Sequence, residues 1–414
     1  MRRSMATAVS ALALASLGLA ACSSNSSGGS GGSGGSTASG PKSPFTILAV
    51  VASSGSLAAV TQSELQGMQA AAKYANAHGG FDGQKVEITV KNDNLDPTTA
   101  ANLVQSALSS GTKPDMVYAG TTSNEAAAIL PILTQNKIFS LQTDVSDTTI
   151  DPSKNPYAFT ISSATSAFGA EVAAATKSHY PAAKKVGIII GNDVNGSSLL
   201  QSEKPELEKQ GYSVVVQTYD PTNTINMTPQ LEALKAAGVQ VLIASGFGAP
   251  AGYILKARAQ IGWNVPVVGD SSFSSNPLTT MASAAALKNV NVLAQPSAIY
   301  KPLSQQNAAF TTLYNAVKPA SGTFEVPFVL YECGWDTIMV AQAAANQAKS
   351  FDPQALTNAL QTLKAQTSPL YLLGNYKYSA SQHSPVPDVA ASTLGSPYTK
   401  DGLDLPFGQT TASS

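Results

Sequence analysis

Two groups of small polar residues lie in the stretch 116–144, and their chemistry suits the binding of a carboxylate. One group follows the apolar run 117–119 and directly precedes a helical pattern: Thr121, Thr122, Ser123 and Asn124. The other follows the apolar run 138–141: Gln142, Thr143 and Asp144. Free N–H groups and the positive end of the helix dipole attract anions to a helix start. Capping of the helix by Thr122 or Ser123 is the alternative interpretation of the first group.

The elements that position these groups alternate between apolar strands and amphipathic helices. Early strands are predicted over 45–51 and 85–90, with a capping box at Thr61–Glu64 and a second helix start at Asp96-Pro97. A second series begins at about residue 166, with strands predicted over 185–190, 213–218 and 239–244. Repeated β-α units predict parallel sheets with helices on both faces. Two similar α/β lobes follow.

The N-terminal segment resembles a bacterial lipoprotein leader. Arg2 and Arg3 precede a short apolar core, and Leu19-Ala20-Ala21-Cys22 has the form of a lipobox. We therefore predict a signal peptide over 1–21, lipidation of Cys22 and a flexible Gly/Ser tether over 22–44. The alternative is an ordinary secretory signal with an incidental cysteine.

Composition excludes some classes of protein. The net charge is −1 with 12% charged residues and no basic run, so nucleic-acid binding has no electrostatic basis. Cys333 is the only cysteine after Cys22, so no disulfide forms within the mature body. No later run reaches membrane-spanning length.

Motifs for catalysis and cofactor binding are weak. The run 246–252 resembles a dinucleotide-binding turn, but its third glycine falls one residue late and Pro250 removes a needed N–H group. The three histidines, His78, His179 and His383, lack metal-ligand spacing. No nucleophile elbow or phosphate-binding loop occurs. We predict no enzyme activity, no cofactor and no metal.

Several landmarks in order resemble the extracytoplasmic substrate-binding proteins of ABC transporters, of the branched-chain amino-acid-binding type. They are 67–83, 120–144, 155–163, 191–196, 231–238, 265–271 and 331–339. The resemblance implies the α/β type I periplasmic-binding-protein fold, with two doubly wound parallel-sheet lobes joined by a three-segment hinge. We assign 45–161 plus 270–324 to lobe 1, 162–269 plus 325–393 to lobe 2, and 394–414 to a flexible tail. Crossovers are expected near Ile161, Gly269 and Phe324.

The resemblance also implies a set of ligand contacts. In lobe 1 these are Ser53 and Ser56 in the first β-α loop, Thr122, Ser123 and Asn124 at the helix start, and Gln142 and Thr143 at the next strand end. In lobe 2 they are Asn195 and Phe247, the latter as an aromatic contact, and Asp270 approaches the ligand ammonium from the crossover between the lobes. The family often has an aromatic residue where this chain has Asn195. One wall of the usual amino-acid pocket is therefore missing, and the class of ligand stays open.

The implied function is capture of a small polar ligand, an amino acid or a related amide or carboxylate, and its delivery to ABC permease subunits. The protein would be extracytoplasmic and anchored to the outer face of the cell membrane through Cys22. A ligand-sensing receptor acting on a membrane signalling partner is the alternative function. A secreted enzyme is a third possibility, for which the sequence offers no catalytic set.

Overall fold

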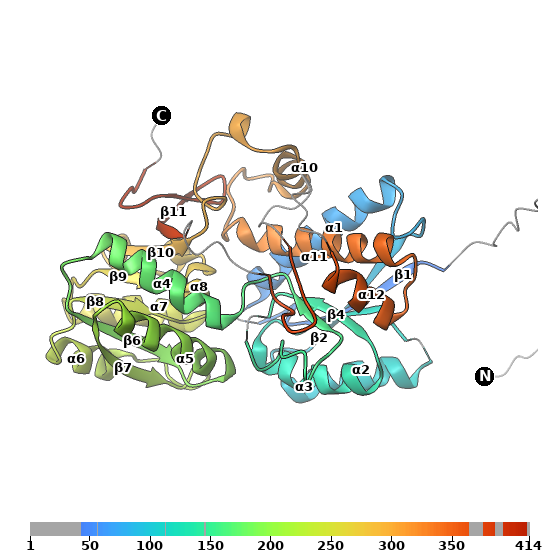
Figure 1. The fold of residues 1–414 in the computed structure, drawn as a ribbon. Coiled ribbons are helices and arrows are strands. Elements are labelled where there is room, and N and C mark those ends of the chain that lie inside the picture. The colour runs from blue at the N-terminus through green and yellow to red at the C-terminus, as the bar shows by residue number, and fades with distance from the viewer. Residues whose placement is uncertain are drawn as a thin grey trace, which may run out of the picture. The chain divides into compact units, whose positions relative to one another are not determined.

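The computed structural model describes residues 43–55, 57–111, 113–144, 146–363, 376–385 and 392–411, and Figure 1 shows their fold. Ser43–Ser414 forms one compact unit. Two β-sheets lie within it, each with helices on both faces. We call the first sheet with its helices lobe 1 and the second sheet with its helices lobe 2.

Within the described ranges, the first sheet has five parallel strands in the order β2-β1-β3-β4-β5. Their bounds are β1 Phe45–Val51, β2 Val86–Asn92, β3 Met116–Ala119, β4 Phe139–Gln142 and β5 Ala158–Thr160. Ile47 and Ala49 of β1 face one helix layer, whereas Leu48 and Val50 face the other. Apart from Thr46, β1 is apolar on both sides, because helices cover both faces of this parallel sheet.

Among the described residues, helices lie on both faces of the first sheet. One layer holds α1 (Ala58–Ala77), α10 (Ala308–Val317), α11 (Val329–Ala348) and α12 (Pro353–Gln361), and the other holds α2 (Pro97–Ser109) and α3 (Ser123–Gln135). The predicted capping box at Thr61–Glu64 is wrong, because α1 begins earlier, at Ala58. Thr61 and Glu64 lie inside the helix and are buried.

In the described part of the chain, the second sheet has seven strands in the order β12-β11-β10-β9-β8-β6-β7. Their bounds are β6 Lys185–Gly191, β7 Ser213–Tyr219, β8 Val241–Ala244, β9 Val267–Gly269, β10 Val290–Ala294, β11 Thr393–Lys400 and β12 Leu403–Pro406. One face packs on α4 (Thr165–His179) and α5 (Val194–Lys209). The other packs on α6 (Thr228–Ala236), α7 (Ala249–Gln260), α8 (Ser271–Ser274) and α9 (Leu278–Met281). The alternation of β-α units predicted both sheets.

The structure corrects the predicted division between the lobes. The chain enters lobe 2 between β5 and α4, and β9 and β10 then pair side by side in the second sheet. Residues 270–294 therefore belong to lobe 2, and no crossover occurs at Gly269, where the chain makes an ordinary β-α turn capped by Asp270. α11 and α12 belong to lobe 1, since they share its hydrophobic cluster and α11 packs on α1. The crossing predicted near Phe324 instead lies between β10 and α10.

The predicted flexible tail over 394–414 is also corrected. β11 pairs antiparallel with β10 and β12 pairs antiparallel with β11, so the described part of this segment extends the second sheet. Leu394, Leu403 and Leu405 are buried. These strands cover an edge of β10 that would otherwise expose unpaired backbone groups.

Candidate functional site

The carboxyl ends of β1, β3 and β4 bring the polar residues of lobe 1 together. Adjacent parallel strands deliver the residues that follow them to one edge of the sheet, where α/β proteins bind ligands. The Ala52 N–H donates to Thr121 Oγ1 at 2.8 Å, and the Ser53 N–H donates to Asn92 Oδ1 at 3.0 Å. We call Ser53, Thr121–Asn124 and Gln142–Asp144 the first edge.

At the start of α3, Thr122 and Ser123 have different roles: one caps the helix and the other contacts a neighbouring strand end. Thr122 is the N-cap residue: its N–H and hydroxyl donate to Glu125 Oε2 at 2.8 and 2.7 Å, and it accepts the Asn124 N–H. Capping therefore holds for Thr122. The Ser123 hydroxyl instead donates to the Asp144 carboxylate at the end of β4. Ser123 thus ties the start of α3 to the neighbouring strand end.

Gln142 ends β4 with a buried amide that is only half satisfied. One end of the amide lies 3.0 Å from the Ser140 hydroxyl. Because that hydroxyl has a single proton and also bonds the carbonyl oxygen of Val117, either end of the amide can face it. The other end has no partner in the part of the chain that the structure describes. Gln142 is fully buried, so this amide end is not exposed to bulk solvent.

Thr143 belongs to a buried hydrogen-bond chain that reaches α1. Its hydroxyl lies 2.8 Å from the Tyr118 hydroxyl, which donates to Glu64 Oε2 at 2.8 Å. Burial raises the pKa of Glu64 to about 7, and the bond from Tyr118 lowers it in part. The sequence analysis missed Tyr118 and Glu64, since a tyrosine inside an apolar strand indicates only core and Glu64 fitted a helix cap.

In lobe 2, Asn195 presents a second half-satisfied amide. Asp193 caps α5 by accepting the Gly196 N–H at 2.9 Å, which places Asn195 in the first turn of the helix. One end of the Asn195 amide donates to Ser272 Oγ at 2.8 Å. The other end is buried and has no partner among the described residues.

Asp270 caps α8, the helix whose Ser272 bonds Asn195. It is fully buried, accepts the Phe273 N–H at 2.9 Å, and lies beside the buried carboxyl of Glu203 on α5. Burial raises the pKa of Asp270 to about 6 and that of Glu203 well above its usual range, and the charge of Asp270 raises the latter further. Two adjacent carboxylates repel, so the pair keeps one proton and one negative charge near neutral pH.

The loop after β8 brings the two lobes into contact. Phe247 is half-buried and packs against the hydrophobic cluster of lobe 1. Gly248 has φ +73° and lies so near Leu57 of lobe 1 that an added Cβ would be 2.7 Å from Leu57 Cδ2. We call Asn195, Phe247–Gly248 and Asp270 the second edge. Phe247 and Gly248 therefore place the second edge against lobe 1.

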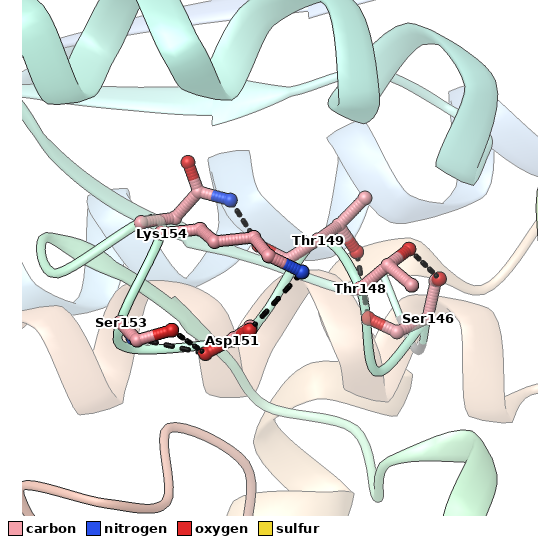
Figure 2. A network of polar contacts seen from close by, with 7 residues as sticks. Ser146, Thr148, Thr149, Asp151, Ser153 and Lys154 are labelled. Atoms are coloured by element: carbon pink, nitrogen blue, oxygen red, sulfur yellow. Dashed lines mark hydrogen bonds and ion pairs between the residues drawn. The ribbon is translucent and has the colours of Figure 1, made fainter.

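A second contact joins the lobes through residues that the sequence analysis did not single out. Ser146, in the loop after β4, lies with its hydroxyl 3.1 Å from that of Ser198 on α5, and α3 and α5 pack together. Figure 2 shows the loop: Ser146 Oγ lies 2.9 Å from Thr148 Oγ1, and the Thr149 hydroxyl donates to the Ser146 carbonyl at 2.8 Å. Asp151 closes the next turn, accepting from Ser153 at 2.7 Å and pairing with Lys154 at 3.3 Å. Internal bonds thus fix the position of Ser146, although serines in a loop carry no distinctive sequence signal.

The two edges present hydroxyls, amides and one buried negative charge, which suit reversible binding of a polar molecule. His383 lies elsewhere and is structural: its Nδ1 bonds the Ala158 carbonyl at 2.8 Å, it stacks on Phe159, and burial lowers its pKa to about 4. Burial raises the pKa of the Cys333 thiol well above its usual value, which disfavours the reactive thiolate. Among the described residues, no His, Cys, Asp and Glu side chains gather in a metal-binding group.

Residues 44–396 match the periplasmic binding protein family. The chain belongs to the periplasmic binding protein family. Leu/Ile/Val-binding protein homolog 1 of Brucella suis biovar 1 is 22% identical over 304 residues, which cover 73% of this chain and 78% of that protein. This match confirms the predicted resemblance to branched-chain amino-acid-binding proteins.

Solved structures of other periplasmic binding proteins share the fold. The leucine-binding protein LivK from Thermotoga maritima aligns with a TM-score of 0.71 and 16% identity, over 86% of this chain and 96% of its own. A solute-binding protein of an ABC transporter from Rhodopseudomonas palustris, in complex with benzoate, aligns with a TM-score of 0.73 and 18% identity, over 88% and 96% of the two chains. The predicted type I fold is therefore confirmed.

Two of the predicted residues of this periplasmic binding protein, Ser56 and Cys22, lie outside the described residues. The other predicted contacts fall on the first or second edge. Within the described ranges, no helix combines the length and the apolar character needed to cross a bilayer.

Proposed function

We propose that this periplasmic binding protein captures a small polar ligand between its lobes and delivers it to an ABC permease outside the cytoplasm. The observation that supports this function best is the pair of half-satisfied amides, Gln142 on the first edge and Asn195 on the second. A buried polar group without a partner costs about 1–3 kcal/mol. Lobe 1 and lobe 2 each carry such a free amide end. A ligand that bonds both would favour closure of the lobes around it.

The class of ligand is inferred from the hydrogen-bond partners that the two amides lack. A free amide end offers N–H donors or a carbonyl acceptor, so a ligand that carries both a carboxylate and N–H groups would satisfy the two amides. The leucine-binding and benzoate-bound relatives take ligands that share a carboxylate. The negative charge shared by Asp270 and Glu203 favours an added ammonium group. An amino acid or a related amide or carboxylate is therefore the proposed ligand.

The other predicted contacts are proposed to complete the site around this ligand. They are Ser53, Ser56, Thr122, Ser123, Asn124, Thr143, Phe247 and Asp270. The carboxylate would meet the helix start of the first edge, and the ammonium would lie toward the second edge. Phe247 would provide an apolar wall, because it already lies against lobe 1.

A thermal-shift screen of amino acids, amides, ureas and small carboxylates tests the function. A true ligand stabilises the folded state by about 2.7 kcal/mol at a hundredfold excess over its Kd.

We expect Gln142→Leu to weaken binding of the strongest ligand by about 1–3 kcal/mol. The melting temperature of the unliganded variant should hold or rise, since the free amide is lost. Calorimetry gives the affinity, and scanning calorimetry gives the melting temperature.

Thr357→Val is the matched control. Thr357 lies on α12, and its buried hydroxyl likewise lacks a partner among the described residues. Replacement by valine removes that group at nearly constant volume, away from both edges, so ligand affinity should not change. If Gln142→Leu binds the ligand as tightly as the wild type, Gln142 is not a contact and the proposed site is wrong.

We further propose that the protein is a lipoprotein held at the membrane through Cys22, on the evidence of its lipobox sequence. Detergent phase partitioning of the wild type and of Cys22→Ser measures anchoring. The wild type should enter the detergent phase and the variant the aqueous phase, because lipid attachment requires the thiol. Equal partitioning of both into detergent would show that another segment anchors the chain.

A further inference from the structure

A cavity of about 460 Å³ shares no lining residue with the first or second edge. Its walls come from β10, β11, β12, the segment of α8 and α9, and residues 323–327. Phe324 and Val326 belong to the hydrophobic cluster of lobe 1, whereas the strands belong to lobe 2. A molecule in this cavity would therefore contact both lobes.

Asp404 places a carboxyl group in the wall of this cavity. Its backbone is held on both sides, since its N–H donates to the Ala298 carbonyl at 2.9 Å and its carbonyl accepts the Tyr300 N–H at 2.8 Å. The residue is only 9% exposed. Across the described ranges, its side chain makes no hydrogen bond or ion pair. Burial alone raises its pKa to about 8.

The charged residues near Asp404 do not neutralise it. Lys400 also lines the cavity, but it is exposed and its Nζ lies over the Tyr300 ring, 4.8 Å from the ring centre. Glu325 is exposed and adds a second acidic group to the lining. A buried carboxyl without a counter-charge is costly. The cavity therefore combines an unpaired acid with space for a partner.

The remaining walls define what that partner looks like. Apolar side chains line much of the cavity: Val292, Phe324, Val326, Tyr398 and Leu405. The volume lies within the range of about 300–1,000 Å³ that is typical of small-molecule sites. We infer that this cavity is a second ligand site, which takes a small organic cation, an ammonium or amidinium on an apolar body, with the Asp404 carboxylate as counter-charge.

Benzamidine and its neutral counterpart benzamide test the inference, because they differ in charge and hardly in shape. Titration calorimetry at about pH 8.5 should show benzamidine binding at least about tenfold more tightly than benzamide. Asp404→Asn should bring the two affinities within about twofold. This variant removes a buried charge, so it should fold at least as well as the wild type. Glu325→Gln, which alters the exposed acid of the same cavity, should keep most of the preference.

The pH dependence gives a second measurement. A carboxyl with a pKa of about 8 is protonated at pH 6 and mostly ionised at pH 9, so benzamidine should bind more tightly as the pH rises. Among the described residues, the other titratable groups on the elements around Asp404 are Tyr300, Glu325, Tyr398, Lys400 and Asp401. Asp404→Asn should remove this rise. Equal binding of both probes to the wild type, or a preference that survives in Asp404→Asn, would overturn the inference and leave the proposed function untouched.

Discussion

Replacement of Gly67 or Gly334 by alanine is expected to destabilise the protein by at least about 3 kcal/mol, the upper end of the cost of overpacking a core. These glycines lie where α1 and α11 pack together. A Cβ at Gly67 would overlap the carbonyl oxygen of Tyr331 and lie 2.9 Å from its carbon. A Cβ at Gly334 would overlap the carbonyl oxygen of Glu64 and lie 2.8 Å from the Met68 nitrogen. Backbone atoms cannot rotate away, so the helices would have to separate.

Gly252→Ala is the matched control for this prediction. Gly252 also lies inside a helix, α7, but the nearest atoms to an added Cβ are those of Met281 at 3.5 Å, an ordinary contact. Alanine should then stabilise that helix by up to about 1 kcal/mol. Urea unfolding of the three variants gives the comparison. If Gly67→Ala unfolds at the wild-type midpoint, the close packing of α1 on α11 is wrong.

The sequence predicted the type of each element better than the lobe to which it belongs. Apolar runs, glycines and prolines report the local conformation of the chain. They therefore indicated the strands, and the repeated β-α units indicated parallel sheets. The choice of sheet depends on side-chain packing between distant segments, which periodicity does not report. β10 and α11 were therefore assigned to the wrong lobes. Residues 394–414 were predicted to be a flexible tail, whereas Leu394, Leu403 and Leu405 are buried in the structure.

The candidate site shows the same limit on a smaller scale. Residue types at strand ends identified Gln142 and Thr143 as candidate contacts. They could not show that Thr122 caps α3 while the adjacent Ser123 reaches Asp144, because both residues suit either role. Ser146 and Ser198 meet only when the two lobes pack. The pairing of Glu203 with Asp270 likewise depends on how α5 packs against the second sheet.

Raising the pH from about 5 to 9 is expected to weaken the fold by several kcal/mol, because buried carboxyl groups must lose protons that they hold in the native state. Glu332 on α11 is 1% exposed, and its Oε2 has no partner within the described ranges. Burial, and next the charge of Asp336, raise its pKa to about 8. Glu64 on the facing helix α1 has a pKa of about 7 for the same main reason. Asp270 and Asp404 shift in the same direction.

Glu332 ionises at different pH values in the unfolded and native states. In the unfolded chain a glutamate ionises near pH 4.5, whereas Glu332 in the native state keeps its proton until about pH 8. The native state therefore binds the proton more tightly. Its contribution to stability is complete below pH 4.5 and is lost as the pH rises through 8. For Glu64 the same loss is complete near pH 7.

Glu332→Gln isolates one of these groups, because the amide has nearly the same shape and does not titrate. The variant should match the wild type near pH 4.5 and exceed its unfolding free energy by roughly 4 kcal/mol near pH 8.5. Denaturant unfolding across this range gives the difference directly. Glu232→Gln, at an exposed position on α6, is the control for replacing a glutamate by glutamine at the surface. A constant difference between Glu332→Gln and the wild type at all pH values would mean that Glu332 is ionised in the native state, and that a counter-charge stabilises the packed face between α1 and α11.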